Sequence, residues 1–183
     1  MATISAVINT KNSAQTLSQA FKSIKWVDEI VGVDMESSDA TVTIAEAAGA
    51  KVFAHKDVGY VEPARNFAIH QATSDWVLFL DADEEISPSL KTYIQKEVLN
   101  SDPEFTIFAL PRKNIVFDYA MEHTGWWPDY QIRLFKKGVV EWNKTIHSQP
   151  TLKAKLHRLP ADPELAIIHH NYSSVAEFID RLN

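Results

Sequence analysis

The sequence predicts an α/β fold in which helices cover both faces of a doubly wound sheet. Short apolar segments alternate with helical segments over residues 1–80, and this βαβ order is typical of a largely parallel sheet. The segment Trp76–Leu80 is apolar at every position, which indicates a strand buried on both sides. The segment Ser13–Ile24 has its apolar residues at helical spacing, as expected of a helix that packs one face on the sheet.

Residues 1–80 divide into strands and helices in alternation. Strands are expected at Ile4–Ile8, Glu29–Val33, Lys51–Ala54 and Trp76–Leu80. Helices are expected at Ser13–Ile24, Ala40–Ala48 and from Pro63 to about Ala72. Asp39 can cap the second helix, and Gly49 follows it as the glycine that commonly ends a helix. Pro63 suits a first helical turn, because the N–H that it lacks would have no partner there.

Beyond Asp83 the regular alternation ends. A helix is expected from Ser87 to about Leu99. Short strands and a closing amphipathic helix are expected at Thr106–Leu110, Ile132–Phe135, Val139–Trp142 and Ser173–Leu182. The chain stops inside or just after this last helix, which is compatible with a C-terminally truncated piece of a longer protein.

Composition excludes several classes of protein. The 183 residues include 18 Lys and Arg against 24 Asp and Glu, a net charge of −6, which argues against a nucleic-acid partner bound through its phosphates. Cysteine is absent, so a disulfide framework, a thiolate nucleophile and Cys-ligated zinc are excluded. No apolar run approaches the roughly 20 residues of a transmembrane helix, and the N-terminus does not resemble a signal peptide. A cytoplasmic location is therefore expected.

Two carboxylates, Asp81 and Asp83, directly follow the buried segment Trp76–Leu80. Ligands of open α/β sheets bind beyond the carboxyl ends of the strands. Residues i and i+2 of an extended backbone point to the same side, so the two carboxylates are expected to share one site. Their like charges favour a cation between them, and Mg²⁺ is often bound by one or two carboxylates together with substrate phosphates. The alternative is that these acidic residues only favour the first turn of a helix.

Polar residues also follow the first and second expected strands. Asp34 can accept hydrogen bonds from a ribose or a base edge, the alternative being a polar loop. The segment Thr10–Asn12 ends the first strand. Neither G-x-G-x-x-G nor G-x-x-x-x-G-K-[ST] occurs, so phosphate binding would depend on a metal and side chains. Arg65 can pair with Asp81 or a phosphate oxygen, or be an ordinary surface arginine.

The segment Trp126–Phe135 is rich in aromatic side chains. Indole faces can stack on sugar rings, although core packing is the commoner use of tryptophan. Asp129 in this segment is the candidate general base, provided that it reaches an acceptor hydroxyl. Asp118 and Glu122, which precede the tryptophans, stay open as alternatives.

The histidines of the second half do not match a zinc motif. His147, His169 and His170 lack partner cysteines and an H-E-x-x-H spacing, so a structural role is expected for each. No G-x-S-x-G turn occurs, so a Ser-His-Asp hydrolase is not supported.

Several segments together resemble glycosyltransferase family 2, although no single one is specific to it. They are Ile4–Asn12 as the opening strand, Asp34–Thr41 as the "D-S-G-S-T-D-x-T" segment, Ala64–Asn66 as the "A-R-N" helix start, and Trp76–Glu84 as the run with the DxD signature. The segment Gln131–Phe135, followed by Ile146 and His147, resembles a subgroup typified by bacterial lipopolysaccharide-core β-glucosyltransferases.

This resemblance implies a single GT-A domain over residues 1–183, with a Rossmann-like doubly wound mixed sheet. Residues 1–85 would bind the nucleotide-sugar, and residues 86–183 would face the acceptor. The implied activity is inverting transfer of a sugar, with a UDP-hexose as donor and Mg²⁺ or Mn²⁺ as cofactor. The implied acceptor is a glycan or glycolipid of lipopolysaccharide or cell-envelope biosynthesis. Peripheral association with the inner face of the membrane would follow.

The resemblance also implies a role for each matching residue. Thr10 and Asn12 would lie near the nucleotide, and Asp34 on the uracil or ribose side. On the donor side, Arg65 would lie beside the nucleobase and the DxD loop, Asp81 would contact the ribose and the metal, and Asp83 would bind the metal. On the acceptor side, Asp129 would be the catalytic base, and Arg133 would contact the substrate.

Two positions depart from the family pattern. Glu36 replaces the usual glycine, which alters the loop near the nucleobase. Ser148 stands where the subgroup usually has Glu. Two other functions stay open. A sugar nucleotidyltransferase would need a glycine-rich, basic loop after the first strand, which Ile8–Asn12 does not provide. A non-catalytic sugar-nucleotide-binding module would bind a UDP-sugar but would not cleave it to free UDP.

Overall fold

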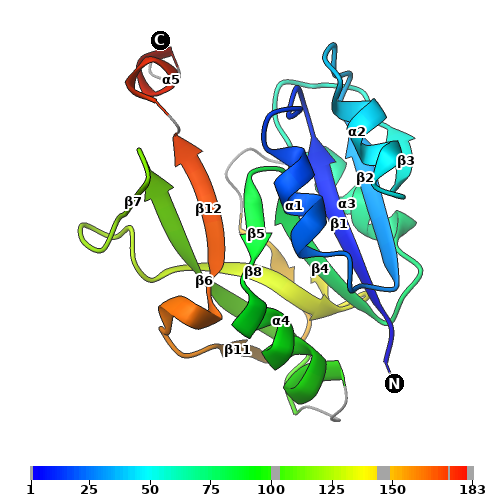
Figure 1. The fold of residues 1–183 in the computed structure, drawn as a ribbon. Coiled ribbons are helices and arrows are strands. Elements are labelled where there is room, and N and C mark those ends of the chain that lie inside the picture. Colours follow the sequence, from blue (N-terminus) through cyan, green and yellow to red (C-terminus); the bar gives the residue numbers. More distant parts are fainter. Residues whose placement is uncertain (1, 100–103, 144–148, 173, 181–183) are drawn as a thin grey trace.

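The computed structural model describes residues 2–99, 104–143, 149–172 and 174–180. A twisted mixed sheet with the strand order β3-β2-β1-β4-β8-β6-β12-β5 forms the centre of the fold (Figure 1). Its first four strands are parallel. They are β1 (Ile4–Thr10), β2 (Glu29–Asp34), β3 (Lys51–Ala54) and β4 (Trp76–Asp81).

The second half of the chain continues the same sheet with mixed strand directions. Strand β8 (Asp129–Lys136) pairs antiparallel with β4 and with β6 (Ile107–Val116). Strand β12 (Ile167–Tyr172) runs parallel to β6, and β5 (Glu84–Ile86) pairs antiparallel with β12. The shorter strands are β7 (Tyr119–Ala120) and β11 (Leu156–Arg158) on β6, and the separate ribbon of β9 (Val140–Glu141) and β10 (Thr151–Leu152).

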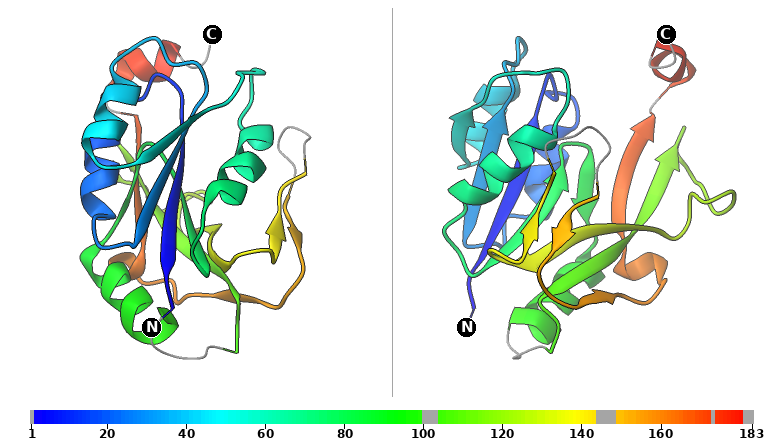
Figure 2. Two further views of the ribbon diagram at one scale, coloured as in Figure 1. Left: turned by 90° about the vertical axis from the view of Figure 1, so that its right-hand side faces the viewer. Right: turned by 180° about the vertical axis from the view of Figure 1, so that it is seen from behind.

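Helices cover both faces of the sheet, as the sequence predicts (Figure 2). One face packs on α1 (Leu17–Ser23), α2 (Thr41–Ala47) and α4 (Pro88–Tyr93), which continues as a π-helical segment (Ile94–Leu99). The other face packs on α3 (Glu62–Gln71) and the β9–β10 ribbon. The remaining helices are the 3₁₀ turn η2 (Pro163–Leu165) and α5 (Val175–Asp180). No helix in the described part of the chain has the length and apolar character needed to cross a bilayer.

The local signals around the helices act as expected at Gly49 and Ser87, whereas Asp39 is not the N-cap of α2. Asp39 accepts a hydrogen bond from the backbone N–H of Thr41 at 3.0 Å, although Ala40 is the residue at the N-cap. Gly49 follows the C-cap of α2 with a φ of +85°, a conformation that favours glycine. Ser87 caps α4 by accepting a hydrogen bond from the N–H of Leu90 at 3.2 Å.

Some predicted elements differ from the structure. The helix expected at Ser13–Ile24 begins only at Leu17, because the preceding residues form turns. The segment Glu84–Ile86, where no strand was expected, is a strand paired with β12, and it leads into α4 through the N-cap Ser87. The strand expected at Thr106–Leu110 extends to Val116, because its polar second half pairs with β12, a strand that the sequence did not reveal.

A buried carboxylate, Glu29, links the first strands at the end of the sheet opposite their carboxyl ends. It receives hydrogen bonds from Ser5, from Lys51 at 2.7 Å and from the backbone N–H of Thr73 at 2.7 Å. Burial opposes its charge, but these donors outweigh burial and lower the pKa of Glu29 from 4.5 to about 2. A carboxylate whose pKa is lowered by folding stabilises the folded state above its unfolded pKa.

We therefore expect Glu29→Gln to lower the free energy of unfolding at pH 7 by roughly 1–3 kcal/mol. The contribution is present above about pH 4.5 and is lost as the pH falls toward about 2. Urea denaturation at pH 7, 5 and 3 should show a deficit that shrinks only below pH 5. The exposed Glu46 on α2 provides a control, and Glu46→Gln should have little effect at any pH. An equal deficit of Glu29→Gln at pH 3 and pH 7 would contradict this account.

Candidate active site

The candidate site lies at the carboxyl ends of β1, β2 and β4, where open α/β sheets bind their ligands. Asn9 on β1 is in register with Asp81 on β4, and Thr10 is in register with Asp34 on β2. Asp34 is buried and accepts hydrogen bonds from the Thr10 hydroxyl at 3.1 Å and from Ser37. The predicted nucleotide-side residues Thr10 and Asp34 are therefore in direct contact.

Asn12 lies beside this pair and joins the loops after β1 and β2. Its side-chain oxygen accepts a hydrogen bond from the backbone N–H of Ser38 at 2.8 Å, and its own N–H donates to the Ser37 hydroxyl at 2.8 Å. Both Asn12 and Glu36 have positive φ, +47° and +56°. Glu36, which replaces the family's usual glycine, thus occupies a backbone conformation that a glycine would adopt without strain.

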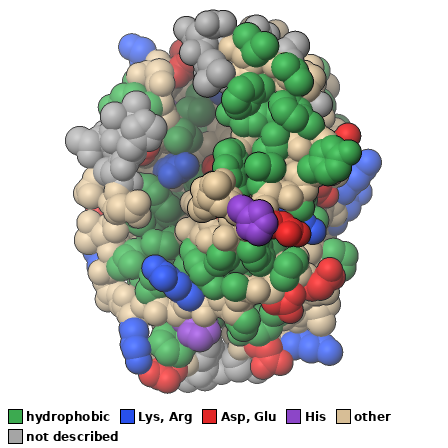
Figure 3. All heavy atoms as spheres, turned by 90° about the vertical axis from the view of Figure 1, so that its left-hand side faces the viewer, with side chains coloured by type: hydrophobic (Ala, Val, Ile, Leu, Met, Phe, Trp, Pro, Cys, Tyr) green, Lys and Arg blue, Asp and Glu red, His purple; other side chains and the backbone are tan. Residues whose placement is uncertain are grey.

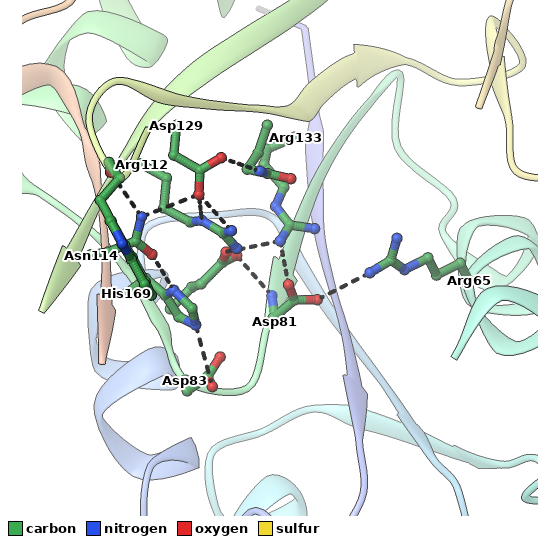
Figure 4. Close-up of polar contacts among 11 residues, drawn as sticks. Arg65, Asp81, Asp83, Arg112, Asn114, Asp129, Arg133 and His169 are labelled. Carbon is green, nitrogen blue, oxygen red and sulfur yellow. Dashed lines mark hydrogen bonds and ion pairs between the residues drawn. The ribbon is translucent and has the colours of Figure 1, made fainter. Parts of the chain in front are cut away.

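A buried arginine, Arg133 on β8, connects the end of β4 to the start of β5. Its guanidinium is 3% exposed and contacts Asp81 and, at 2.8 Å, the fully buried Glu84 (Figure 4). Glu84 also accepts a hydrogen bond from the backbone N–H of Asp81 at 3.0 Å. Burial disfavours the charge on Arg133, but the two carboxylates outweigh burial and raise its pKa. Arg133 and Arg65 together lower the pKa of Asp81 against the effect of burial.

A second arginine, Arg112 on β6, links Glu84 to Asp129. Its Nη1 lies 3.0 Å from Glu84, and its Nε and Nη2 donate to one Asp129 oxygen at 2.8 and 2.6 Å. Burial would raise the pKa of Asp129, but Arg112, Asn114 and Gln131 lower it. Asp129 is therefore ionised, the form that can accept a proton, and is a weaker base than an isolated carboxylate.

The network continues from Asp129 to Asp83 through two further residues. The buried Asn114 donates to Asp129 at 3.2 Å and accepts from Nδ1 of His169 at 2.6 Å. The other ring nitrogen of His169 lies 3.5 Å from Asp83. Since Asn114 Oδ1 can only accept, Nδ1 is the donor of this hydrogen bond, and Nε2 is the ring nitrogen that faces the Asp83 carboxylate.

Asp81 and Asp83 do not point to the same side, contrary to the expectation from their spacing. Residues 82 and 83 form a turn, so the extended geometry behind that expectation ends at Asp81. Asp81 points to Arg133 and to Arg65, whose Nη2 is 3.7 Å away, whereas Asp83 points to His169 (Figure 4).

A cavity of about 650 Å³ opens beside this turn and is within the usual size range of small-molecule sites. Asp83 lines it together with Asn9, Asn12, Asp118 and His170. Seen from the side of β7 and β12, the surface is hollowed in its upper half, with hydrophobic side chains gathered nearby (Figure 3). Glu122, the other alternative base, lines a separate cavity of about 300 Å³ with Trp127.

Buried polar side-chain atoms without a hydrogen-bond partner also gather around Asp81. Among the described residues, the buried side-chain atoms without a hydrogen-bond partner belong to Asn9, Arg65 and Arg133. All three residues neighbour Asp81, through strand register or through ion pairs. Because buried polar groups in proteins are nearly always partnered, such a cluster indicates a place where a polar ligand binds.

The donor set fits a divalent cation of the Mg²⁺ or Mn²⁺ type. Asp83 and the Nε2 of His169 face one another, and such a cation commonly takes one or two protein ligands plus phosphate oxygens. No cluster of three or more His, Asp or Glu side chains with metal-ligand geometry occurs among the described residues. The backbone N–H of His170 donates to the Asp83 carbonyl at 2.9 Å, but the His170 ring contacts Glu85 and Gln19, so the described histidines do not form a zinc site. His147 and Ser148 lie outside the described residues.

A family model described as Glycosyl transferase family 2 matches residues 5–158. The chain belongs to glycosyltransferase family 2. Among similar proteins, an uncharacterized glycosyltransferase of Rickettsia felis is 47% identical over 96 residues, 52% of this chain and 34% of the relative. The glycosyltransferase SunS of Bacillus phage SPbeta is 29% identical over 177 residues, 93% of this chain and 40% of SunS. The chain thus spans well under half the length of both relatives.

Solved structures of other proteins share the fold. S. aureus TarS matches with a TM-score of 0.58 and 22% identity, covering 75% of this chain and 48% of TarS. Glucosyl-3-phosphoglycerate synthase from Mycobacterium tuberculosis matches with a TM-score of 0.50 and 23% identity, covering 63% of this chain and 44% of the synthase. The predicted GT-A fold, a curled mixed α/β sheet, is confirmed by these likenesses.

The buried ion pairs of this glycosyltransferase predict an asymmetry between two arginines. Arg133→Met leaves Asp81 and Glu84 without their shared partner and should lower the free energy of unfolding by about 3–5 kcal/mol. Arg158→Met removes an exposed arginine whose guanidinium lies over the Tyr130 ring, and should cost less than about 1 kcal/mol. Urea denaturation of both variants tests this, and equal losses would contradict the importance of burial.

Proposed function

We propose that this family 2 glycosyltransferase transfers a sugar from a UDP-sugar, with inversion and with the help of Mg²⁺ or Mn²⁺, to a glycan or glycolipid acceptor. The observation that supports this proposal most is that the two carboxylates at the end of β4 point in different directions. Asp81 is held between Arg65 and Arg133, whereas Asp83 faces a cavity large enough for a nucleotide-sugar. Solved complexes of the M. tuberculosis synthase hold UDP with Mg²⁺ and UDP-glucose with Mn²⁺, which supports the choice of donor and metal.

On the donor side, different residues would contact different parts of the UDP-sugar. Asp34, with Thr10 and Asn12, would contact the nucleoside, because these side chains border the carboxyl ends of β1 and β2. Asp81, ionised between Arg65 and Arg133, would accept hydrogen bonds from ribose hydroxyls. Asp83 would hold the metal, which, when bound, supplies Lewis-acid stabilisation of the departing diphosphate.

On the acceptor side, one carboxylate would receive a proton. The acceptor oxygen forms a bond to the anomeric carbon, its proton passes to the base, and the bond from that carbon to the diphosphate breaks, releasing UDP. Asp129 is ionised and hydrogen-bonded, so it is ready to accept a proton although its basicity is reduced. Asp118 is the alternative with structural support, because it lines the same cavity as Asp83.

The finer assignments from the sequence stay predictions. These are a role in lipopolysaccharide-core or cell-envelope biosynthesis, a cytoplasmic location at the inner face of the membrane, and a single domain over residues 1–183. The non-catalytic binding module is distinguished from the enzyme by one assay. Release of UDP from a UDP-sugar, by transfer or by slow hydrolysis, supports the enzyme, and binding without release supports the module.

We expect UDP to bind more tightly in the presence of Mg²⁺ or Mn²⁺, because Asp83 would hold a cation that offsets the negative charge of the diphosphate. Calorimetry of Asp83→Ala with metal should give the weak affinity that the unchanged protein shows in EDTA. Asp28 lies at the opposite end of β2, so Asp28→Ala should keep the metal effect. Unchanged UDP affinity in Asp83→Ala with metal present would overturn the metal assignment.

We expect Asp129→Asn to lower the rate of UDP release from UDP-glucose by about 10²–10⁴-fold, because the amide cannot accept the proton. UDP affinity with metal should stay nearly unchanged, since Asp129 does not line the Asp83 cavity.

The matched variant Asp118→Asn decides between the two carboxylates. Retention of more than about a third of the turnover in Asp129→Asn would be a loss far smaller than that caused by a missing base. If Asp118→Asn loses its turnover in the same assay, the base is Asp118. Melting temperatures of both variants control for disruption of the Arg112 ion pair.

A further inference from the structure

A second cavity, of about 420 Å³, lies on the α3 side of the sheet and is not part of the Asp83 cavity. We name it the arginine cavity, because its described lining includes Arg65 from α3, Arg133 from β8 and Arg158 from β11, and no acidic residue. Tyr130 and Trp142 complete its aromatic wall. The elements that contribute these residues lie together in the right-hand view of Figure 2.

Two of the three guanidinium groups have buried donors that no protein atom uses. The side chain of Arg133 is only 3% exposed, and its Nε has no hydrogen-bond partner. The Nε of Arg65 is likewise buried without a partner, and the Asp81 oxygen 3.7 Å from Arg65 is too far for a normal hydrogen bond. These Nε atoms are enclosed by protein, so a ligand would meet the terminal nitrogens. Each guanidinium has five N–H donors, and the hydrogen bonds of Arg133 to Asp81 and Glu84 use only Nη2.

Aromatic rings hold these guanidinium groups without using their N–H donors. Arg65 and Arg133 lie 5.4 and 5.5 Å from the centroid of the Phe79 ring, and Arg65 is also 5.8 Å from that of Trp142. Arg158 lies 5.4 Å from the centroid of Tyr130. Stacking of this kind fixes the guanidinium while its edge stays free for a phosphate or carboxylate.

The arginine cavity borders Asp81, through Arg65 and Arg133, and it also reaches the acceptor side of the site. Gln131 lines the cavity and donates a hydrogen bond to Asp129, the candidate base, at 2.7 Å. Asp83 lines the other cavity. A group bound among the arginines would therefore lie one side chain away from the carboxylate that receives the acceptor proton.

We propose that the arginine cavity binds an anionic group of the acceptor, a phosphate in preference to a carboxylate, and that the acceptor is a phosphorylated hydroxyl compound. The inference rests on the proposed transferase function and specifies its acceptor class. Phosphate is favoured because its oxygens can receive donors from three guanidinium groups at once, whereas a carboxylate has only two oxygens. The acceptor hydroxyl then points toward Asp129.

Binding of a small phosphate ester tests the proposal while the donor site is filled. Glycerol 3-phosphate is titrated, at constant ionic strength, into the protein saturated with UDP and Mg²⁺, and the tryptophan fluorescence is followed because Trp142 lines the cavity. We expect saturable binding of glycerol 3-phosphate and none of glycerol. Arg158→Ala should weaken binding about 10-fold, the loss expected for one charge-assisted hydrogen bond, and Arg158→Lys should weaken it less.

The matched control is Lys155→Ala, which removes the same charge just before β11. Lys155 is 72% exposed and pairs with Glu104 outside the cavity, so its removal should leave binding unchanged. Equal effects of Arg158→Ala and Lys155→Ala, or no saturable binding, would overturn the proposal. So would displacement by UDP of glycerol 3-phosphate that was bound first in the absence of UDP, which would assign the cavity to the donor diphosphate. Phosphate-ester binding without any UDP binding would instead refute the proposed donor and leave the arginine cavity supported.

Discussion

The ion pairs of Arg133 with Asp81 and Glu84 join the two halves of the sheet at the place where the candidate site forms. Asp81 ends β4, Glu84 begins β5 and Arg133 lies on β8, so one guanidinium holds three strands together. Charges buried to this degree are tolerated only when they are paired and hydrogen-bonded. The turn between β4 and β5 is held by these pairs, and this turn sets the different directions of Asp81 and Asp83.

That turn gives the site two sides. Asp83 faces the larger cavity with Asn12 and Asp118, and Asp81 faces the arginines that line the smaller one. The sides communicate through a chain of contacts from Asp83 through His169 and Asn114 to Asp129. A transferase has to bring a donor and an acceptor together, and two cavities joined by one hydrogen-bonded network suit that task.

Much of the first half of the fold was predictable, because local patterns specify it. The apolar run of β4, the turn at Gly49 and the helix starts near Pro63 and Ser87 act within a few residues of themselves. Strand β12 was not predictable in this way. Its residues His169 and His170 interrupt the apolar alternation, and the segment is a strand only because β6 and β5 supply its backbone partners.

For the candidate site, the sequence alone determined which residues stand at strand ends, among them Asp34, Asp81 and Asp83. Position after a buried strand is a local property, and it can be read without knowing the neighbours. The sequence offered Arg65 as one partner of Asp81, and the structure shows that pair, but only the tertiary structure decided the other partners. Arg133 is 52 residues from Asp81, and Arg112 is 28 residues from Glu84. Contacts over such separations depend on which strands lie side by side, and a buried charge selects its partner from those neighbours, not from the adjacent sequence.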